Sequence, residues 1–183
     1  MTDEPGAIFI PTQNHFSGRQ GQRPRYIIVH GTAGGSQAEA IARYFQSTEN
    51  TSNPVSSHYV IGQDGTIVQC VREADGAWGN GVVTAGHAPW WSSDLNPNYI
   101  SISVEHCKSS ISNSEQLTEA QKEASFRLIE HICKRYDIPM READAKGGIT
   151  GHFSIDPVNR ARCPGPYPWD ELFATLAQHH TVS

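Results

Sequence analysis

The 183-residue chain lacks long apolar runs, paired cysteines and an excess of basic residues. Its apolar runs are only a handful of residues long, which excludes insertion into a membrane. Its four cysteines lie far apart without a CxxC pair, which excludes a zinc finger and a dithiol redox motif. Because 14 Lys and Arg stand against 19 Asp and Glu, giving a net charge of −5, nothing favours nucleic acid as a partner.

The amino terminus also lacks the basic and then apolar pattern of a secretory signal. We therefore expect synthesis in a cytoplasm without a signal peptide, wherever the protein acts. Residues 1–24 are rich in Pro, Gly and Gln, which predicts an arm either laid over the domain or left loose. Residues 25–178 are expected to form one domain, because the length and the hydrophobic content of 37% suit a single core. Residues 179–183 are expected to form a C-terminal tail.

Two strands are predicted to end in side chains that can do chemistry. The β-branched run at 26–30 indicates a buried strand with His30 at its carboxyl end. Residues 100–105 alternate strictly between apolar and polar side chains, so their apolar members share one face and Glu105 lies on the other. His152 stands at the end of a further short strand.

Helices and a hairpin complete the predicted elements. Ser36 begins a capping box and a short amphipathic helix, Thr118 begins a longer one, and a last helix opens at Pro168. Residues 57–61 and 66–70 flank an Asp-Gly pair, which predicts a β-hairpin. Strands interleaved with three helices predict a single α/β domain with a central mixed sheet flanked by helices.

Two histidines and one cysteine make a candidate metal site. His30 and His152 stand at strand ends, where open α/β proteins place ligands. Cys163 follows in a stretch whose Pro and Gly force irregular backbone. Two neutral imidazoles and a thiolate suit Zn²⁺ and leave a fourth position for water, as catalytic zinc sites do. On spacing alone, hydrogen-bonded histidines and a buried cysteine are the simpler interpretation.

Short motifs around these residues occur in the order seen in one enzyme family. They are IIVHGTA at 27–33, VSSHYVI at 55–61 with DGTI at 64–67, AW at 77–78, ISISVE at 100–105, TGH at 150–152 and CPGP at 163–166. Together they resemble zinc-dependent N-acetylmuramoyl-L-alanine amidases of the amidase-2 type, which share their fold with peptidoglycan recognition proteins. The resemblance covers residues 25–178.

The resemblance implies that His30, His152 and Cys163 bind zinc and that Glu105 does general acid/base work. Zinc held by three protein groups lowers the pKa of its water and polarises a carbonyl, which hydrolysis of an unreactive amide needs. A carboxylate beside that water can take its proton and pass it to the leaving amine. His58 lies in the same motifs, and we expect it to hydrogen-bond within the sheet rather than to bind metal.

Some positions depart from the family's pattern. Many relatives carry a lysine two residues before the last zinc ligand, where this chain has Ala161. We expect Arg160 to supply the positive charge that stabilises the oxyanion, with Arg162 as the alternative. Ser57 stands where some members carry a tyrosine. This chain therefore has no residue at that position to perform the role of the tyrosine. Gly79 stands where others have a histidine.

The long loop at 76–97 holds the candidate substrate contacts. Its apolar residues follow neither the helical nor the strand periodicity. Long loops in compact domains are often functional. We expect Trp78 and Asn80 to contact the substrate. Trp90 and Trp91 suit a platform for a sugar ring and a cover over the core equally well.

The leading hypothesis is a monomeric zinc amidase that cuts the bond between N-acetylmuramic acid and L-alanine in peptidoglycan. The missing signal fits an endolysin that lyses the cell wall after release, an enzyme that recycles wall fragments, or an autolysin exported otherwise. A non-catalytic peptidoglycan-binding module on the same fold is the alternative, although all three ligands are present. A cysteine peptidase is a distant third, because Cys163 precedes Pro164 and no helix start lowers its pKa.

Overall fold

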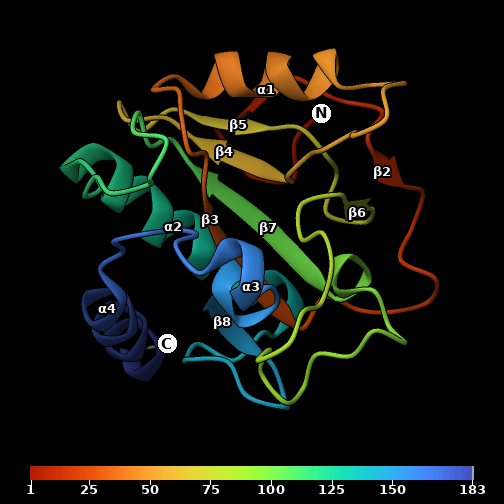
Figure 1. The fold of residues 1–183 in the computed structure, drawn as a ribbon. Helices are drawn as coiled ribbons and strands as arrows, with labels where there is room; N and C mark the ends of the chain where they lie inside the picture. Colours follow the sequence, from red (N-terminus) through yellow and green to blue (C-terminus); the bar gives the residue numbers. More distant parts are fainter. Residues whose placement is uncertain (183) are drawn as a thin grey trace.

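The computed structural model describes residues 1–182, which form a six-stranded mixed sheet between helices (Figure 1). Its strands are β1 (Ile8–Phe9), β3 (Tyr26–Gly31), β4 (Tyr59–Ile61), β5 (Ile67–Gln69), β7 (Ser101–His106) and β8 (Gly148–Gly151), in the order β1-β5-β4-β7-β3-β8. Neighbours pair in parallel except β4 and β5, which are antiparallel and form the predicted hairpin. A separate antiparallel pair joins β2 (His15–Phe16) to β6 (Gly76–Ala77). The predicted fold class is confirmed.

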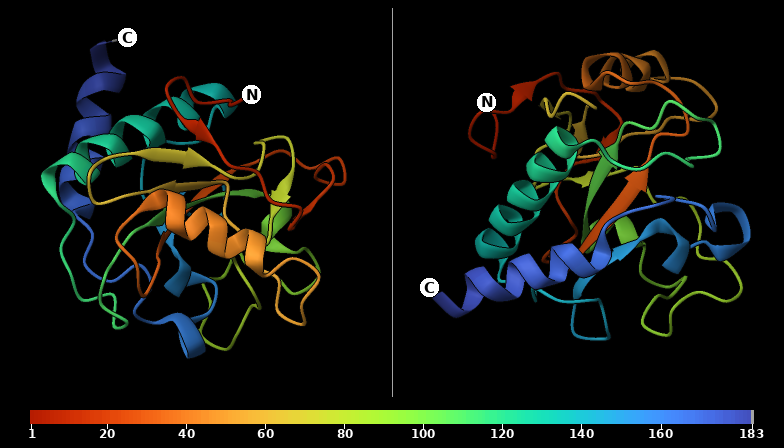
Figure 2. Two further views of the ribbon diagram at one scale, coloured as in Figure 1. Left: turned by 90° about the horizontal axis from the view of Figure 1, so that it is seen from above. Right: turned by 90° about the vertical axis from the view of Figure 1, so that its left-hand side faces the viewer.

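Helices cover both faces of the sheet. They are α1 (Ala38–Ser47), α2 (Glu119–Tyr136), α3 (Pro157–Arg160) and α4 (Trp169–Val182), with 3-10 turns η1 (Pro97–Tyr99) and η2 (His152–Ser154). Figure 2 shows α1 on one face and α2 and α4 on the other. Helix α4 includes residues 179–182 of the predicted tail, and residue 183 lies outside the described part. None of the helices in residues 1–182 has the length and apolarity to cross a membrane.

The alternation along β7 separates an apolar face from a polar one, whereas β3 is apolar on both faces up to His30. Ile27 and Val29 of β3 pack with Ile102 and Val104 of β7 in the main core cluster, against α2 and α4. Ile100 was predicted on this face, but it precedes β7 and packs in a different cluster. The opposite face of both strands is therefore available for the polar side chains at their carboxyl ends.

The two predicted capping boxes have different outcomes. Thr118 accepts a hydrogen bond from the backbone N–H of Gln121, as predicted. The side chain of Gln121 does not close the box but donates to a backbone carbonyl at the end of β4, which joins α2 to the sheet. Helix α1 begins at Ala38 with Gln37 as an N-cap that makes no side-chain cap bond, so the box predicted at Ser36 is wrong. Packing of an apolar face, rather than capping, holds α1 in place.

Residues 1–24 lie against the domain. Strand β1 adds an edge to the sheet, and β2 pairs with β6. Arg19 is 6% exposed and donates to backbone carbonyls that include those of Tyr99 and Ser101. Glu4 is 1% exposed and accepts hydrogen bonds from two side chains of α2. Buried, paired charges of this kind hold the arm to the rest of the fold.

Candidate active site

A cleft of about 730 Å³ lies between α1 and α3. Its lining also includes residues from 53–56, 78–81 and 111–113, and the side chains of His30, Glu105, His152 and Cys163. These four come from separate segments of the sequence. The cleft is therefore where the sequence-predicted residues meet.

The sheet topology brings these side chains together. His30 of β3 lies directly opposite Glu105 of β7 in the parallel register. Strand β8 pairs with the other side of β3, and His152 follows its last residue. Three neighbouring parallel strands thus place their carboxyl ends at one edge, which is where open α/β sheets bind ligands. Cys163 reaches the same edge from the loop after α3, where its Sγ accepts a hydrogen bond from the backbone N–H of Gly31 at 3.4 Å.

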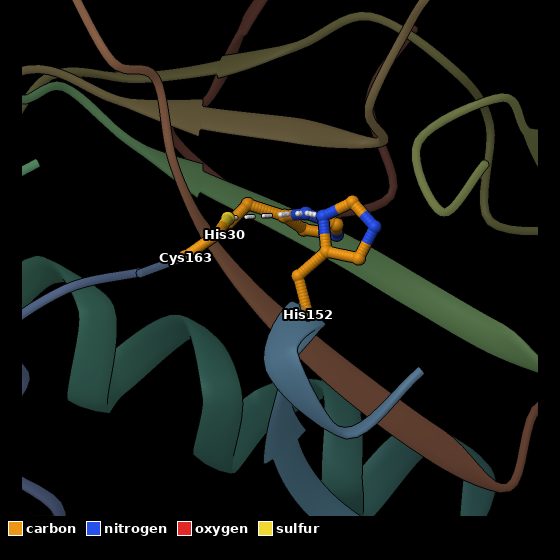
Figure 3. Close-up of side chains that lie close together, drawn as sticks. All are labelled: His30, His152 and Cys163. Atoms are coloured by element: carbon orange, nitrogen blue, oxygen red, sulfur yellow. Dashed lines mark hydrogen bonds between the residues drawn. The ribbon is translucent and has the colours of Figure 1, made fainter. Parts of the chain in front are cut away.

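His30, His152 and Cys163 point toward a common centre (Figure 3). The Nδ1 atoms of the two histidines are 3.1 Å apart, and Cys163 Sγ lies 4.0 Å from His30 Nδ1. The three potential ligand atoms all lie within 4.8 Å of one another. All three residues are buried. The predicted donor set therefore forms a compact group in the described structure.

A second layer of polar groups orients the two imidazoles. His152 Nε2 lies 2.8 Å from the backbone carbonyl of Asn80, and His30 Nε2 lies 3.2 Å from the hydroxyl of Ser103. A carbonyl only accepts, so the neutral ring of His152 carries its proton on Nε2 and has a lone pair on Nδ1. Partners of this kind are typical of metal-binding histidines.

Burial sets the charge states of the group. Burial lowers the pKa of His30 well below its ordinary value, and it also lowers the pKa of His152, so both rings are neutral near pH 7. Burial, with the charge of Glu105, raises the pKa of the Cys163 thiol to about 12. Neutral imidazoles are ready to bind a metal cation, whereas the thiol must release its proton to solvent when its sulfur binds one.

Glu105 is the carboxylate of the site. Burial raises its pKa from 4.5 to about 8, and the positive charge of Arg160 opposes this rise. Its Oε2 atom is buried and has no hydrogen-bond partner in the described structure. A carboxyl group with a raised pKa and a free oxygen in a cleft suits proton transfer.

The positive charge of Arg160 acts on the groups of the site. It lowers the pKa of Glu105, His30 and His152. Helix α3 presents Arg160 because Asp156 caps its first turn and Pro157 occupies its first position. Arg160 and Arg162 are both exposed and line the cleft.

The predicted aromatic loop has mixed outcomes. Trp78 lines the cleft, and its indole Nε1 is buried without a partner. Asn80 was predicted to contact substrate, but it is 0% exposed. Its observed role is instead to accept a hydrogen bond from His152 Nε2 through its backbone carbonyl. Trp91 is 2% exposed in a core cluster, and Trp90 stacks on Tyr26, so these two rings cover the core.

Sequence reasoning missed two residues beside the site. Ser103 stands two positions before Glu105, so the alternation already placed it on the same face. Lys108 is 0% exposed and donates to backbone carbonyls of the loops beside Cys163. No sequence pattern predicts this burial, because a lysine after a strand is ordinarily solvated. His58 bonds within the fold, as predicted, to the backbone of Ser103 and Asp75.

The fold is that of known amidases. The chain resembles the structure of a selenomethionine derivative of AmpD at 23% identity, covering 96% of this chain and 98% of that one, with a TM-score of 0.76. It resembles the N-acetylmuramoyl-L-alanine amidase LysC from Clostridium intestinale at 19% identity, with 95% and 99% covered and a TM-score of 0.65. A mutant endolysin from Bacillus subtilis matches at 22% identity, with 96% and 99% covered and a TM-score of 0.65.

Sequence comparison identifies the family. No curated protein sequence matches the chain. A family model described as N-acetylmuramoyl-L-alanine amidase matches residues 20–166, which is most of the chain and includes every residue of the site. The chain therefore belongs to the amidase-2 family of N-acetylmuramoyl-L-alanine amidases.

Proposed function

We propose that the chain hydrolyses the amide bond between N-acetylmuramic acid and L-alanine in peptidoglycan, with Zn²⁺ held by His30, His152 and Cys163. The observation that carries the proposal is the group of three ligand atoms within 4.8 Å of one another, in the same cleft as Glu105. When bound, Zn²⁺ would supply a Lewis acid that polarises the amide carbonyl and makes water acidic enough to attack near neutral pH.

The donor set fits zinc better than the harder divalent cations. Two imidazole nitrogens and one sulfur suit Zn²⁺, whereas Mg²⁺ and Ca²⁺ prefer oxygen ligands. The carbonyl of Asn80 holds His152 in the tautomer whose Nδ1 can bind. Three protein ligands, rather than four, are typical of catalytic zinc sites.

Glu105 moves the proton in the proposed reaction. Its carboxylate takes a proton from the attacking water and passes it to the leaving amine of L-alanine. The unpartnered Oε2 atom supports this role, because no other group of the described residues is hydrogen-bonded to it. Arg160 contributes positive charge where the carbonyl oxygen becomes an oxyanion. Arg162 is then an exposed neighbour at the cleft.

We further propose that the protein is a monomer that lyses the cell wall, as an endolysin or autolysin, after release from the cytoplasm. Structures that the chain resembles include one described as an endolysin from Bacillus subtilis and one described as an endolysin amidase from Clostridium intestinale. The cleft has a volume of about 730 Å³, within the range of ligand-binding pockets. Trp78 lines it and offers an aromatic contact for the substrate.

Metal analysis of matched cysteine variants tests the zinc site. Cys163→Ala removes the proposed ligand, and Cys133→Ala removes another buried cysteine, which α2 contributes to the main core cluster. We expect the unsubstituted chain and the Cys133 variant to retain one Zn²⁺ per chain through dialysis and to clear a suspension of cell walls. We expect the Cys163 variant to lose both properties.

Equal zinc retention by the two variants would contradict the site. Retained zinc without hydrolysis of cell walls by the unsubstituted chain would favour the alternative, a peptidoglycan-binding module that does not cut its ligand. Folding of each variant is followed by circular dichroism, so that loss of metal is separated from loss of structure.

A further inference from the structure

Residues 14–16 of the amino-terminal arm pack against the segment that carries Trp78. Strand β2 pairs with β6, the strand that ends just before Trp78 (Figure 1). The ring of Phe16 meets the indole of Trp78 edge-on, with 5.6 Å between the ring centroids, and stacks on Tyr99 at 4.5 Å. The family model begins its match at residue 20, so these contacts come from a part of the chain outside that match.

Asn14 joins the same arm to another part of the cleft wall. It is 2% exposed, and its Nδ2 donates to the backbone carbonyls of Phe45 at 2.9 Å and Val55 at 3.1 Å. Phe45 belongs to α1, and both of these residues line the cleft. The backbone carbonyl of Asn14 accepts a hydrogen bond from the hydroxyl of Ser56. A single buried residue of the arm is therefore hydrogen-bonded to two segments of the cleft wall.

Ser56 connects Asn14 to Trp78. Its Oγ accepts a hydrogen bond from the backbone N–H of Trp78 at 2.9 Å, and its own N–H donates to the carbonyl of Trp78 at 3.1 Å. A Cβ at Gly79 would lie 2.9 Å from the carbonyl of Ser56, so the two segments are in close contact. The backbone of Trp78 is thus held through Ser56 and its ring by Phe16, and both contacts lead to the arm.

We propose that Asn14 and Phe16 are positioning residues that hold Trp78 in the orientation in which it binds substrate. This inference rests on the proposed function, which gives Trp78 a contact with peptidoglycan. A side chain that is ordered before the substrate arrives loses less conformational entropy on binding, which raises affinity. Neither Asn14 nor Phe16 is among the described residues that line the cleft, so both act through Trp78.

The proposed zinc site has a different anchor. Asn80, whose carbonyl accepts a hydrogen bond from His152, donates its backbone N–H to Asn98 Oδ1 at 3.2 Å and its Nδ2 to Ser101 Oγ at 2.9 Å. These two partners belong to η1 and β7 rather than to residues 14–16. Loss of the arm contacts is therefore expected to weaken substrate binding while the metal site and the chemical step stay intact.

Steady-state hydrolysis of a soluble N-acetylmuramoyl peptide, followed in zinc-loaded protein, tests the inference. We expect Phe16→Leu and Asn14→Ala each to raise KM about 3- to 10-fold, with kcat within about twofold and Zn²⁺ content unchanged. Phe9→Leu is the matched control, because this arm phenylalanine lies opposite Gln69 in β1 and should leave KM unchanged. Circular dichroism follows folding, and Phe16→Leu decides the test if the Asn14 variant does not fold.

Fluorine-19 NMR of the chain labelled with 5-fluorotryptophan reports on Trp78 itself. The chain has four tryptophans, and Trp78→Phe identifies the resonance that belongs to Trp78. We expect Asn14→Ala and Phe16→Leu to shift or broaden that resonance and to leave the other three unchanged. Equal changes at all four would indicate general loosening of the fold and would overturn the positioning role.

The outcomes separate this inference from the proposed function. Unchanged KM in both folded arm variants, or a fall in kcat without a rise in KM, would overturn this inference alone. Failure of the unsubstituted, zinc-loaded chain to hydrolyse the peptide would overturn the proposed function and this inference with it.

Discussion

Replacement of Lys108 by methionine is expected to loosen the loops beside the proposed metal site. Lys108 follows β7, and its Nζ donates to the backbone carbonyls of Glu115 at 2.6 Å, Pro166 at 2.9 Å and Asn113 at 3.4 Å. The first and third carbonyls belong to the loop before α2, and the second belongs to the segment that follows Cys163. One buried ammonium group therefore joins a wall of the cleft to a ligand-bearing loop.

The size of the effect follows from these contacts. A hydrogen bond to a charged group contributes about 1.5–3 kcal/mol, and two of the three distances are short, so the bonds together contribute roughly 3–6 kcal/mol. Methionine does not have to be desolvated as a charge, which returns part of this energy. We expect a net loss of about 3 kcal/mol in the free energy of unfolding. For a domain of this size that corresponds to a melting temperature lower by about 6–12 °C.

Urea unfolding and hydrogen exchange measure this prediction. Lys122→Met serves as the control, because Lys122 makes its ion pairs with Glu119 and Glu171 on the surface, and we expect little change there. In the Lys108 variant, amide exchange should increase in the loop before α2 and in the segment after Cys163. A loss below about 1 kcal/mol, or unchanged exchange in both segments, would refute the reasoning about buried unsatisfied carbonyls.

Further predictions concern the acid/base group, the ligand loop and the two arginines. Glu105→Gln should reduce hydrolysis of a muropeptide at least about 100-fold while Zn²⁺ content is unchanged, and full activity would remove Glu105 from the reaction. The raised pKa of Glu105, about 8 against 4.5, means that the folded metal-free protein keeps a proton that the unfolded chain loses. Its melting temperature should therefore fall, relative to the Gln variant, as pH rises from 4.5 to about 8, and parallel pH profiles would contradict this sign. Gly165 has a φ of +81°, and a Cβ there would collide with the backbone oxygen of Asn113, so Gly165→Ala should cost at least about 2 kcal/mol in urea unfolding. Arg160→Ala should lower kcat more than Arg162→Ala does, and equal effects would argue against the assignment.

The sequence predicted the strands and the residues at their ends because periodicity reports which face of a strand is buried. His30 and Glu105 lie near the carboxyl ends of recognisable strands, and His152 follows one. Their convergence depends on strand order, and β7-β3-β8 adjacency is a tertiary fact that periodicity does not contain. The resemblance to a family supplied that link. It also favoured the metal-binding interpretation of Cys163, which lies in a loop with no periodic signal.

The residues behind the site were beyond sequence reasoning for a physical reason. Asn80 acts through its backbone carbonyl, so its side-chain type predicted a substrate contact that its burial rules out. Lys108 donates to backbone carbonyls of two loops that are distant in the sequence. Arg19 donates to the backbone carbonyl of Tyr99, which is also distant from it in the sequence. Backbone acceptors have no residue type, so a sequence does not reveal where they gather.

Mass spectrometry of the products released from purified cell-wall sacculi tests the central claim most directly. The unsubstituted chain and the His152→Ala variant are incubated in parallel with Zn²⁺. We predict that the unsubstituted chain alone releases stem peptides with a free L-alanine amine and leaves the glycan strands uncut. Cleavage at any other bond, release by both proteins, or intact sacculi with zinc bound would contradict the account.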